Sequence, residues 1–118
     1  MADVAVSKQT TTKPNTVTKF TRTSIAAGNT AVINADYNDQ RTLILVQNAS
    51  ASDDAMLTLH HGNAYGGVND VTAIVEKGTE AAFTLDSTIF KNVSGANAGK
   101  IRITSDKAVS IAVVEARV

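Results

Sequence analysis

The residues of this sequence that could do chemistry are few, and their spacing fits no familiar catalytic or metal site. His60 and His61 are the two histidines. Adjacent side chains on a strand point to opposite faces, so these rings are poorly placed to chelate one metal ion. The chain has no cysteine, which excludes a disulfide, a thiolate metal site and a cysteine nucleophile. We therefore expect no metal site and no cofactor.

Other polar segments also lack the pattern of a chemical site. Two loops are rich in side-chain oxygens, namely Asp36, Asn38 and Asp39 in one and Asn63, Asn69 and Asp70 in the other. Both lack the ordered ligand spacing and the bidentate Glu of a helix–loop–helix Ca²⁺ site. The Gly66-Gly67 pair lacks the Lys-Ser/Thr that follows a phosphate-binding loop, and no serine lies in a nucleophile elbow. The sequence thus predicts a protein that is not an enzyme and has no small-molecule substrate.

Length and charge limit the classes of partner. A chain of 118 residues is one domain, and its 11 basic and 11 acidic residues give a net charge of zero. A nucleic-acid-binding protein normally carries a basic surplus, so we expect no nucleic-acid partner. No apolar run approaches the roughly 20 residues of a membrane span, and the N-terminus lacks the apolar stretch of a secretory signal. We expect no membrane partner and synthesis in the cytoplasm.

The elements that must position these residues are predicted to be strands. The sequence has 13 Val, 8 Ile and 15 Thr against 5 Leu, and β-branched residues suit a pleated, half-buried surface. After residue 18, short apolar or alternating segments recur every eight to twelve residues or so, with turn residues between them. This pattern predicts an all-β fold, a single small β-sandwich (Ig-like or jelly-roll-like) or a β-barrel, over residues 19–118.

The predicted strands differ in how their side chains are expected to face the core. They cover residues 19–25, 30–35, 41–47, 55–60, 71–75, 81–85, 100–104 and 109–115. Two pairs are predicted as β-hairpins, 71–75 with 81–85 and 100–104 with 109–115. In the second pair, Ile101 and Ile103 are expected to face inward. The four consecutive apolar residues of strand 41–47 predict a central strand covered on both faces.

Residues 1–18 are expected to form an extended N-terminal arm outside this domain. They are rich in Thr, Lys, Gln and Asn and hold the one proline of the chain. Such a segment buries too little apolar area to fold alone, so it is either a disordered tail or a strand that orders against a partner. The candidate partner-binding residues of this arm are Val4, Val6, Lys8, Lys13, Pro14, Val17, Lys19 and Phe20.

About two thirds of the chain, from Arg41 onward, resembles the small capsid decoration proteins of tailed bacteriophages. The resemblance lies in RTLILVQN at 41–48, a Gly- and Asn-rich loop at 62–70, VEKGTEAAFTLDSTIFKNVSG at 75–95 and KIRITSDKAVSIAVVEA at 100–116. It implies a structural virion protein, also called a cement or head-stabilising protein, that binds the capsid exterior in many copies. Its implied partners are the major capsid protein and neighbouring copies of itself, a homotrimer being one arrangement.

Two further interpretations are open. The alternative function is a non-catalytic surface-binding module, such as a carbohydrate- or host-surface-binding β-sandwich, for which Tyr37 and Tyr65 are the candidate aromatic contacts. Charge is also unevenly distributed, with a net of +3 in residues 1–30, −6 in residues 31–90 and +3 in residues 91–118. This distribution is either an ordinary solvated surface or the means by which a basic arm meets an acidic surface on a neighbouring molecule.

Overall fold

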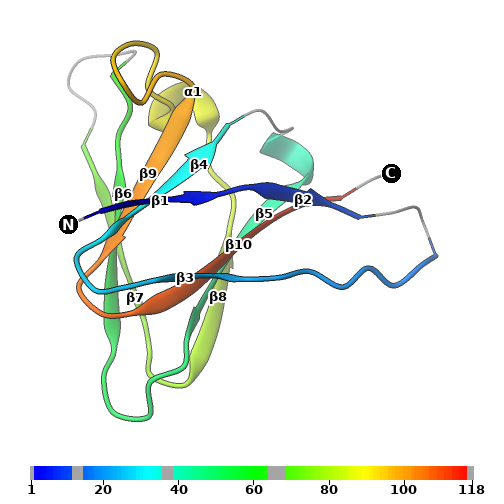
Figure 1. Ribbon diagram of the computed structural model, residues 1–118, viewed down its shortest axis with the longest axis vertical. Coiled ribbons are helices and arrows are strands. Elements are labelled where there is room, and N and C mark those ends of the chain that lie inside the picture. Colours follow the sequence, from blue (N-terminus) through cyan, green and yellow to red (C-terminus); the bar gives the residue numbers. More distant parts are fainter. Residues whose placement is uncertain (1, 12–14, 36–38, 64–68, 117–118) are drawn as a thin grey trace.

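Two packed sheets form a β-sandwich in the computed structural model, which describes residues 2–11, 15–35, 39–63 and 69–116 (Figure 1). The first sheet has, in spatial order, strands β1 (Asp3–Val6), β4 (Thr30–Asn34), β9 (Lys100–Ser105), β6 (Ala55–His60) and β7 (Val71–Val75). The second has β2 (Lys8–Thr10), β10 (Val109–Glu115), β5 (Thr42–Asn48) and β8 (Thr79–Phe83), and β3 (Thr23–Ile25) also pairs with β10. The all-β prediction is confirmed, and of the two architectures predicted the sandwich is the one formed.

The core lies between the inner faces of the two sheets. Strand β9 shows why, because its residues alternate between half-buried and buried, and Ile101 and Ile103 face inward as predicted. The largest buried side chains come from both sheets, and they include Ile25, Ile33, Ile44, Leu57, Ile101, Ile103 and Ile111. Helical structure in the described residues is limited to η1 (Asp39–Arg41) and α1 (Ser87–Phe90). Neither helix is long enough to cross a membrane.

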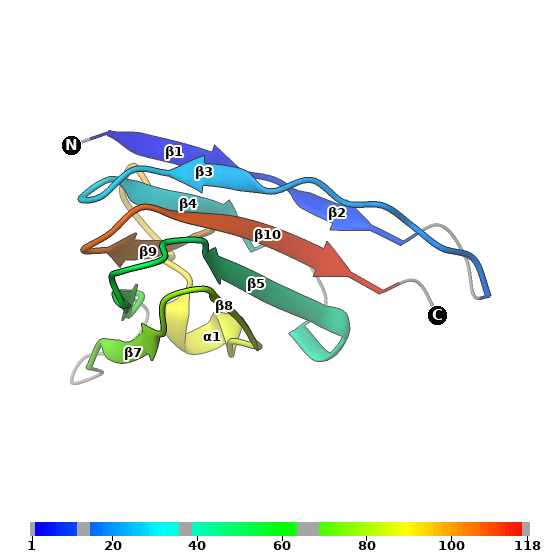
Figure 2. The same cartoon turned by 90° about the horizontal axis from the view of Figure 1, so that it is seen from below.

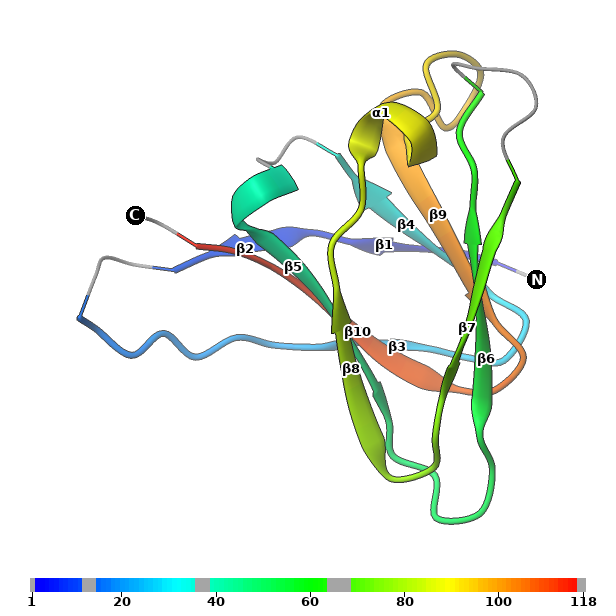
Figure 3. The ribbon, with the colours of Figure 1, turned by 180° about the vertical axis from the view of Figure 1, so that it is seen from behind.

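Both predicted hairpins are wrong. Strand β7 pairs with β6 in the first sheet, whereas β8 pairs with β5 in the second. Strands β9 and β10 are likewise divided between the first and second sheets, so each connection carries the chain from one sheet to the other (Figure 3). Two strands that face one core from opposite sides have the same alternation as two strands of a hairpin. The alternating pattern therefore located these strands without identifying their partners.

The prediction for strand 41–47 is correct about position and wrong about burial. Strand β5 lies inside its sheet, between β10 and β8. Its inner face is buried, but Leu43 on its outer face is 47% exposed. The apolar run therefore contains side chains that face the core and side chains on the outer face of the sheet. The described residues leave this outer face partly exposed.

Much of the predicted N-terminal arm lies within the sandwich. Strand β1 pairs in parallel with β4, and β2 pairs in parallel with β10, so residues 3–10 add one edge strand to each sheet (Figure 2). Val6 is 3% exposed and belongs to the core. Strand hydrogen bonds and this buried side chain hold the segment in place although it is short of apolar residues.

Candidate functional site

The most prominent exposed feature is a loop of residues 15–22, which we call the projecting loop. It leaves β2 and returns to β3, and it extends beyond the ends of the sheets (Figures 1 and 2). Val17 on this loop is 94% exposed, and Phe20 is 39% exposed. Lys19 between them is also exposed. The loop therefore presents two apolar side chains and one cation to solvent.

Polar contacts fix the base of the projecting loop to the second sheet. The Thr21 amide donates to Oε1 of Gln9 at 2.8 Å, and Nε2 of Gln9 donates to the Thr21 carbonyl at 2.7 Å. The Arg22 guanidinium forms an ion pair with Glu80 of β8, and it lies 5.2 Å from the centroid of the Phe20 ring. The loop is therefore positioned at its return end, next to Phe20.

An apolar strip on the outer face of the second sheet begins where this loop is fixed. Gln9 of β2 is the register partner of Val114 in β10, and Val114 is the partner of Leu43 in β5. Val114 is half-buried, and Leu43 is more exposed. We define the candidate docking surface as Val17, Lys19 and Phe20 of the loop together with Val114 and Leu43 of this strip. This strip was not predicted, because the apolar run of strand 41–47 indicated a strand covered on both faces.

The structure divides the predicted partner-binding residues into separate groups. Val6 is buried and Val4 packs against the core, so neither side chain is presented to a partner in this conformation. Val17, Lys19 and Phe20 lie together on the projecting loop and are exposed. Lys13 and Pro14 lie outside the described residues. Lys8 lies on β2, where its Nζ is 3.3 Å from Oε1 of Glu115.

These ion pairs bear on the uneven distribution of charge. Lys8 and Arg22 belong to the basic N-terminal part, and both contact a carboxylate of their own chain. Glu80, the partner of Arg22, belongs to the acidic middle part. Part of the attraction between the two parts is therefore satisfied within one molecule. Lys19 lies exposed on the projecting loop and is the cation of the docking surface.

The histidine pair forms a polar cluster with Asp70. Nδ1 of His60 lies 3.3 Å from Oδ2 of Asp70, and Nδ1 of His61 lies 2.5 Å from Oδ1. Strand alternation was expected to place the two side chains on opposite faces, but both rings lie beside Asp70, because β6 ends at His60 and the alternation does not extend to His61. The hydrogen bonds that the His61 backbone amide and ring make to Asp70 lower the pKa of this carboxyl.

The described residues do not combine this cluster with further metal ligands. Among residues 2–11, 15–35, 39–63 and 69–116, no group of three or more His, Cys, Asp or Glu side chains is placed to hold a metal ion. Asp36 and Asn38 of the first oxygen-rich loop, the Gly66-Gly67 pair, and both tyrosines proposed for glycan binding lie outside the described residues.

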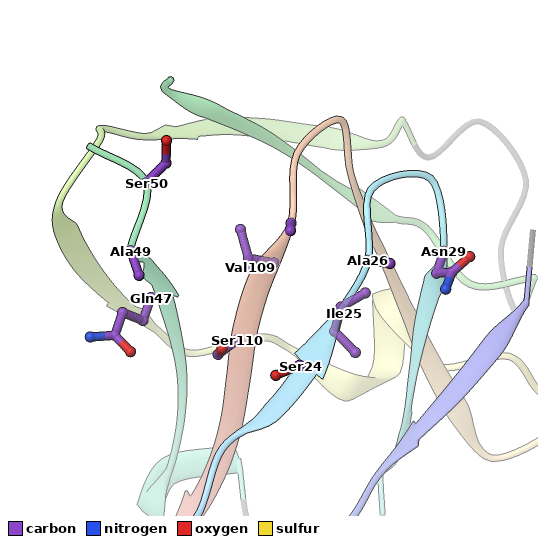
Figure 4. A pocket seen from close by; sticks show the side chains of 10 residues that line it. Ser24, Ile25, Ala26, Asn29, Gln47, Ala49, Ser50, Val109 and Ser110 are labelled. Atoms are coloured by element: carbon purple, nitrogen blue, oxygen red, sulfur yellow. The ribbon is translucent and has the colours of Figure 1, made fainter. Parts of the chain in front are cut away.

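The surface of the described residues includes two shallow hollows. The larger, about 570 Å³, is lined by residues of β3, β10 and the end of β5, including Ser24, Gln47 and Ser110 (Figure 4). None of its lining side chains is acidic, basic or histidine, so it offers hydrogen bonds but no group for acid–base catalysis. The smaller, about 320 Å³, includes His60 and Thr104, whose Nε2 and Oγ1 are 2.9 Å apart.

Comparisons with known proteins leave this geometry as the basis for a functional proposal. No family model matches the chain, and no curated protein and no solved structure matches it.

Proposed function

We propose that this chain is a structural virion protein that decorates the outside of a bacteriophage capsid and stabilises it. The observation that carries the proposal is the exposure of Val17 at 94% on a loop whose base is fixed by Gln9 and Arg22. An anchored loop with an apolar residue at full exposure suits attachment to another protein. The identity of the partner is inferred from the resemblance of residues 41–116 to decoration proteins. On that basis, the expected partner is the major capsid protein.

Attachment would combine modest contacts made by many copies. Full burial of an exposed apolar side chain such as Val17 contributes about 1.5–3 kcal/mol, part of which is offset by the ordering of groups at the interface. Leu43 is already about half buried and contributes less. Lys19 adds attraction to an acidic partner surface, so added salt is expected to weaken binding. Copies that also contact one another on a repeating lattice gain further from multivalency.

The test is binding to undecorated heads assembled from the major capsid protein of the same genome. The full-length protein is expected to co-sediment with the heads and to saturate at a fixed number of copies for each head. Val17→Asp is expected to reduce occupancy at least several-fold without lowering the stability of the free protein, because this side chain is almost completely exposed.

A matched control is available at a distant site. Val93 is 57% exposed on the loop that precedes β9, so Val93→Asp introduces the same charge away from the docking surface. It is expected to leave occupancy unchanged. No co-sedimentation of the unaltered protein would overturn the proposal. Glycan binding without head binding would replace it with the surface-binding module that the sequence also allowed.

A further inference from the structure

We infer that residues 3–10, the N-terminal segment formed by β1 and β2, exchange between two copies of this chain, each copy completing the sheets of the other. The inference concerns the protein alone and does not rest on the proposed function. It follows from how this segment is held, from what it covers, and from the length of chain that joins it to the rest of the sandwich.

The segment behaves as a separable strip at the edge of the fold. Its pairings with β4 and β10 are parallel, whereas the other strand pairings among the described residues are antiparallel. In β1 and β2, Val6 is the one buried residue, and the others are exposed or half-buried. A strip with few buried side chains opens at a lower free energy than the core strands do. Local release of β1 and β2 is therefore expected to cost less free energy than opening the buried core strands.

Release of the strip leaves an acceptor surface that a matching strand satisfies. Ala5 pairs with Val32 and Val6 with Ile33, while Lys8 pairs with Val113 on the other sheet. The amide of Thr30 donates to the Ala2 carbonyl at 3.0 Å, which continues the pairing to the start of the strip. Without the strip, the edges of β4 and β10 expose unpaired backbone groups and an open core position.

The structure itself identifies the occupant that fits this surface. Residues 3–10 satisfy two sheet edges at once and fill the core position with Val6. A second copy of the chain carries the same segment and can make every one of these contacts. The exchanged dimer, in which each strip lies on the other copy, and the closed monomer, in which it lies on its own chain, share the same strand pairings. Their free energies therefore differ mainly through the conformation of the connecting segment and through protein concentration.

The connection is long enough for either arrangement. Twelve residues separate the end of β2 at Thr10 from the start of β3 at Thr23. These two residues pair with Glu115 and Ile111 of β10, which lie about 13 Å apart along the strand. Twelve extended residues reach about 40 Å. The excess length permits the strip to fold back on its own chain or to cross to a neighbouring copy.

The absence of native cysteine permits a direct test. One version of the chain carries Ala5→Cys and a second, with a mass tag, carries Val32→Cys; the two positions are register partners in β1 and β4. The versions are mixed in urea, refolded together at increasing protein concentration and oxidised. A disulfide between them requires β1 of one chain to lie on β4 of the other. We expect this heterodimer to form, with a yield that rises with the refolding concentration.

The control for disulfides formed by random collision is a mixture of one chain with Ala5→Cys and a second chain with Val93→Cys. Val93 is exposed in a loop and pairs with no strand. The Ala5–Val32 heterodimer is expected to exceed this control several-fold. A chain that carries both Ala5→Cys and Val32→Cys can close a disulfide within the monomer when it is oxidised at low concentration. This disulfide locks the strip onto β4 of its own chain. In light scattering, the locked protein should stay monomeric, whereas the unaltered protein should form dimers. A heterodimer yield no higher than the control, or an unaltered protein that remains monomeric throughout, would overturn the inference.

Discussion

The side-chain amide of Gln9 pairs with the backbone of Thr21 as a neighbouring strand would. Its Oε1 accepts from the Thr21 amide at 2.8 Å, and its Nε2 donates to the Thr21 carbonyl at 2.7 Å. The base of the projecting loop is thus joined by one side chain to β2, and through β2 to β10. The position of Phe20 depends on this pairing, because Phe20 directly precedes Thr21.

Gln9→Ala is expected to release the return end of the projecting loop. Both lost hydrogen bonds are exposed, so water replaces them and the free energy of unfolding should fall by only about 1 kcal/mol. Amide hydrogen exchange at Thr21 should accelerate markedly. Gln9→Glu is the matched control, because a carboxylate still accepts from the Thr21 amide but cannot donate to its carbonyl, and its effect should be intermediate. Unchanged exchange at Thr21 in Gln9→Ala would contradict this description of the loop.

Val6→Ala tests whether the N-terminal segment is part of the folded core. The substitution removes two buried methyl groups from a side chain that is 3% exposed, so urea unfolding should show a loss of about 2 kcal/mol. Val17→Ala makes the same chemical change at an exposed position and should alter stability by less than about 0.5 kcal/mol. Equal effects of the two substitutions would show that β1 does not pack against β4 in solution.

Strand positions were largely predictable from the sequence, whereas strand partners were not. The strand predicted at 55–60 is β6, and that predicted at 71–75 is β7, because alternating or β-branched residues mark where a chain lies on a sheet. Which sheet a strand joins depends on how the turn between strands redirects the chain. The turn around Gly78, with φ of 69°, leads from the first sheet to the second although its sequence resembles a hairpin turn.

The candidate site was predictable in part for a similar reason. Val17, Lys19 and Phe20 could be selected because they lie in a polar segment with too few apolar residues to fold alone. Their separation from Val6 was not predictable, because the burial of Val6 depends on strands that follow much later in the chain. The exposed Leu43 was missed because an apolar run indicates strand but does not tell which of its faces is covered.

The Asp70 cluster predicts a pH dependence of stability. Hydrogen bonds from His61 favour the ionised carboxylate and lower the pKa of Asp70 in the folded protein. This contribution is complete above the ordinary carboxyl pKa and is lost as the pH falls from there through the lowered value. Asp70→Asn should therefore be less stable than the unaltered protein near neutral pH, by a modest amount because Asp70 is partly exposed.

Urea unfolding at a series of pH values measures this difference. The difference in the free energy of unfolding between Asp70→Asn and the unaltered protein should become smaller as the pH falls through the acidic range. Asp53→Asn is a suitable control, because Asp53 is an exposed carboxylate on the loop before β6. A gap that stays constant down to the lowest pH would show that the ionised carboxylate is not what the two histidines stabilise.

Gly62 marks a close approach between two segments that the sequence does not reveal. Its amide donates to the Ile89 carbonyl at 2.8 Å, and a Cβ at this position would lie 2.6 Å from the carbonyl carbon of Lys91. The obstruction is backbone and cannot rotate away, so Gly62→Ala should lower the free energy of unfolding by about 3 kcal/mol. Gly28→Ala is the informative comparison, because Gly28 has a φ of 80° and no atom near the added methyl group. Its cost of about 1 kcal/mol comes from backbone conformation alone, and equal costs at the two glycines would show that residue 62 does not contact residues 89–91.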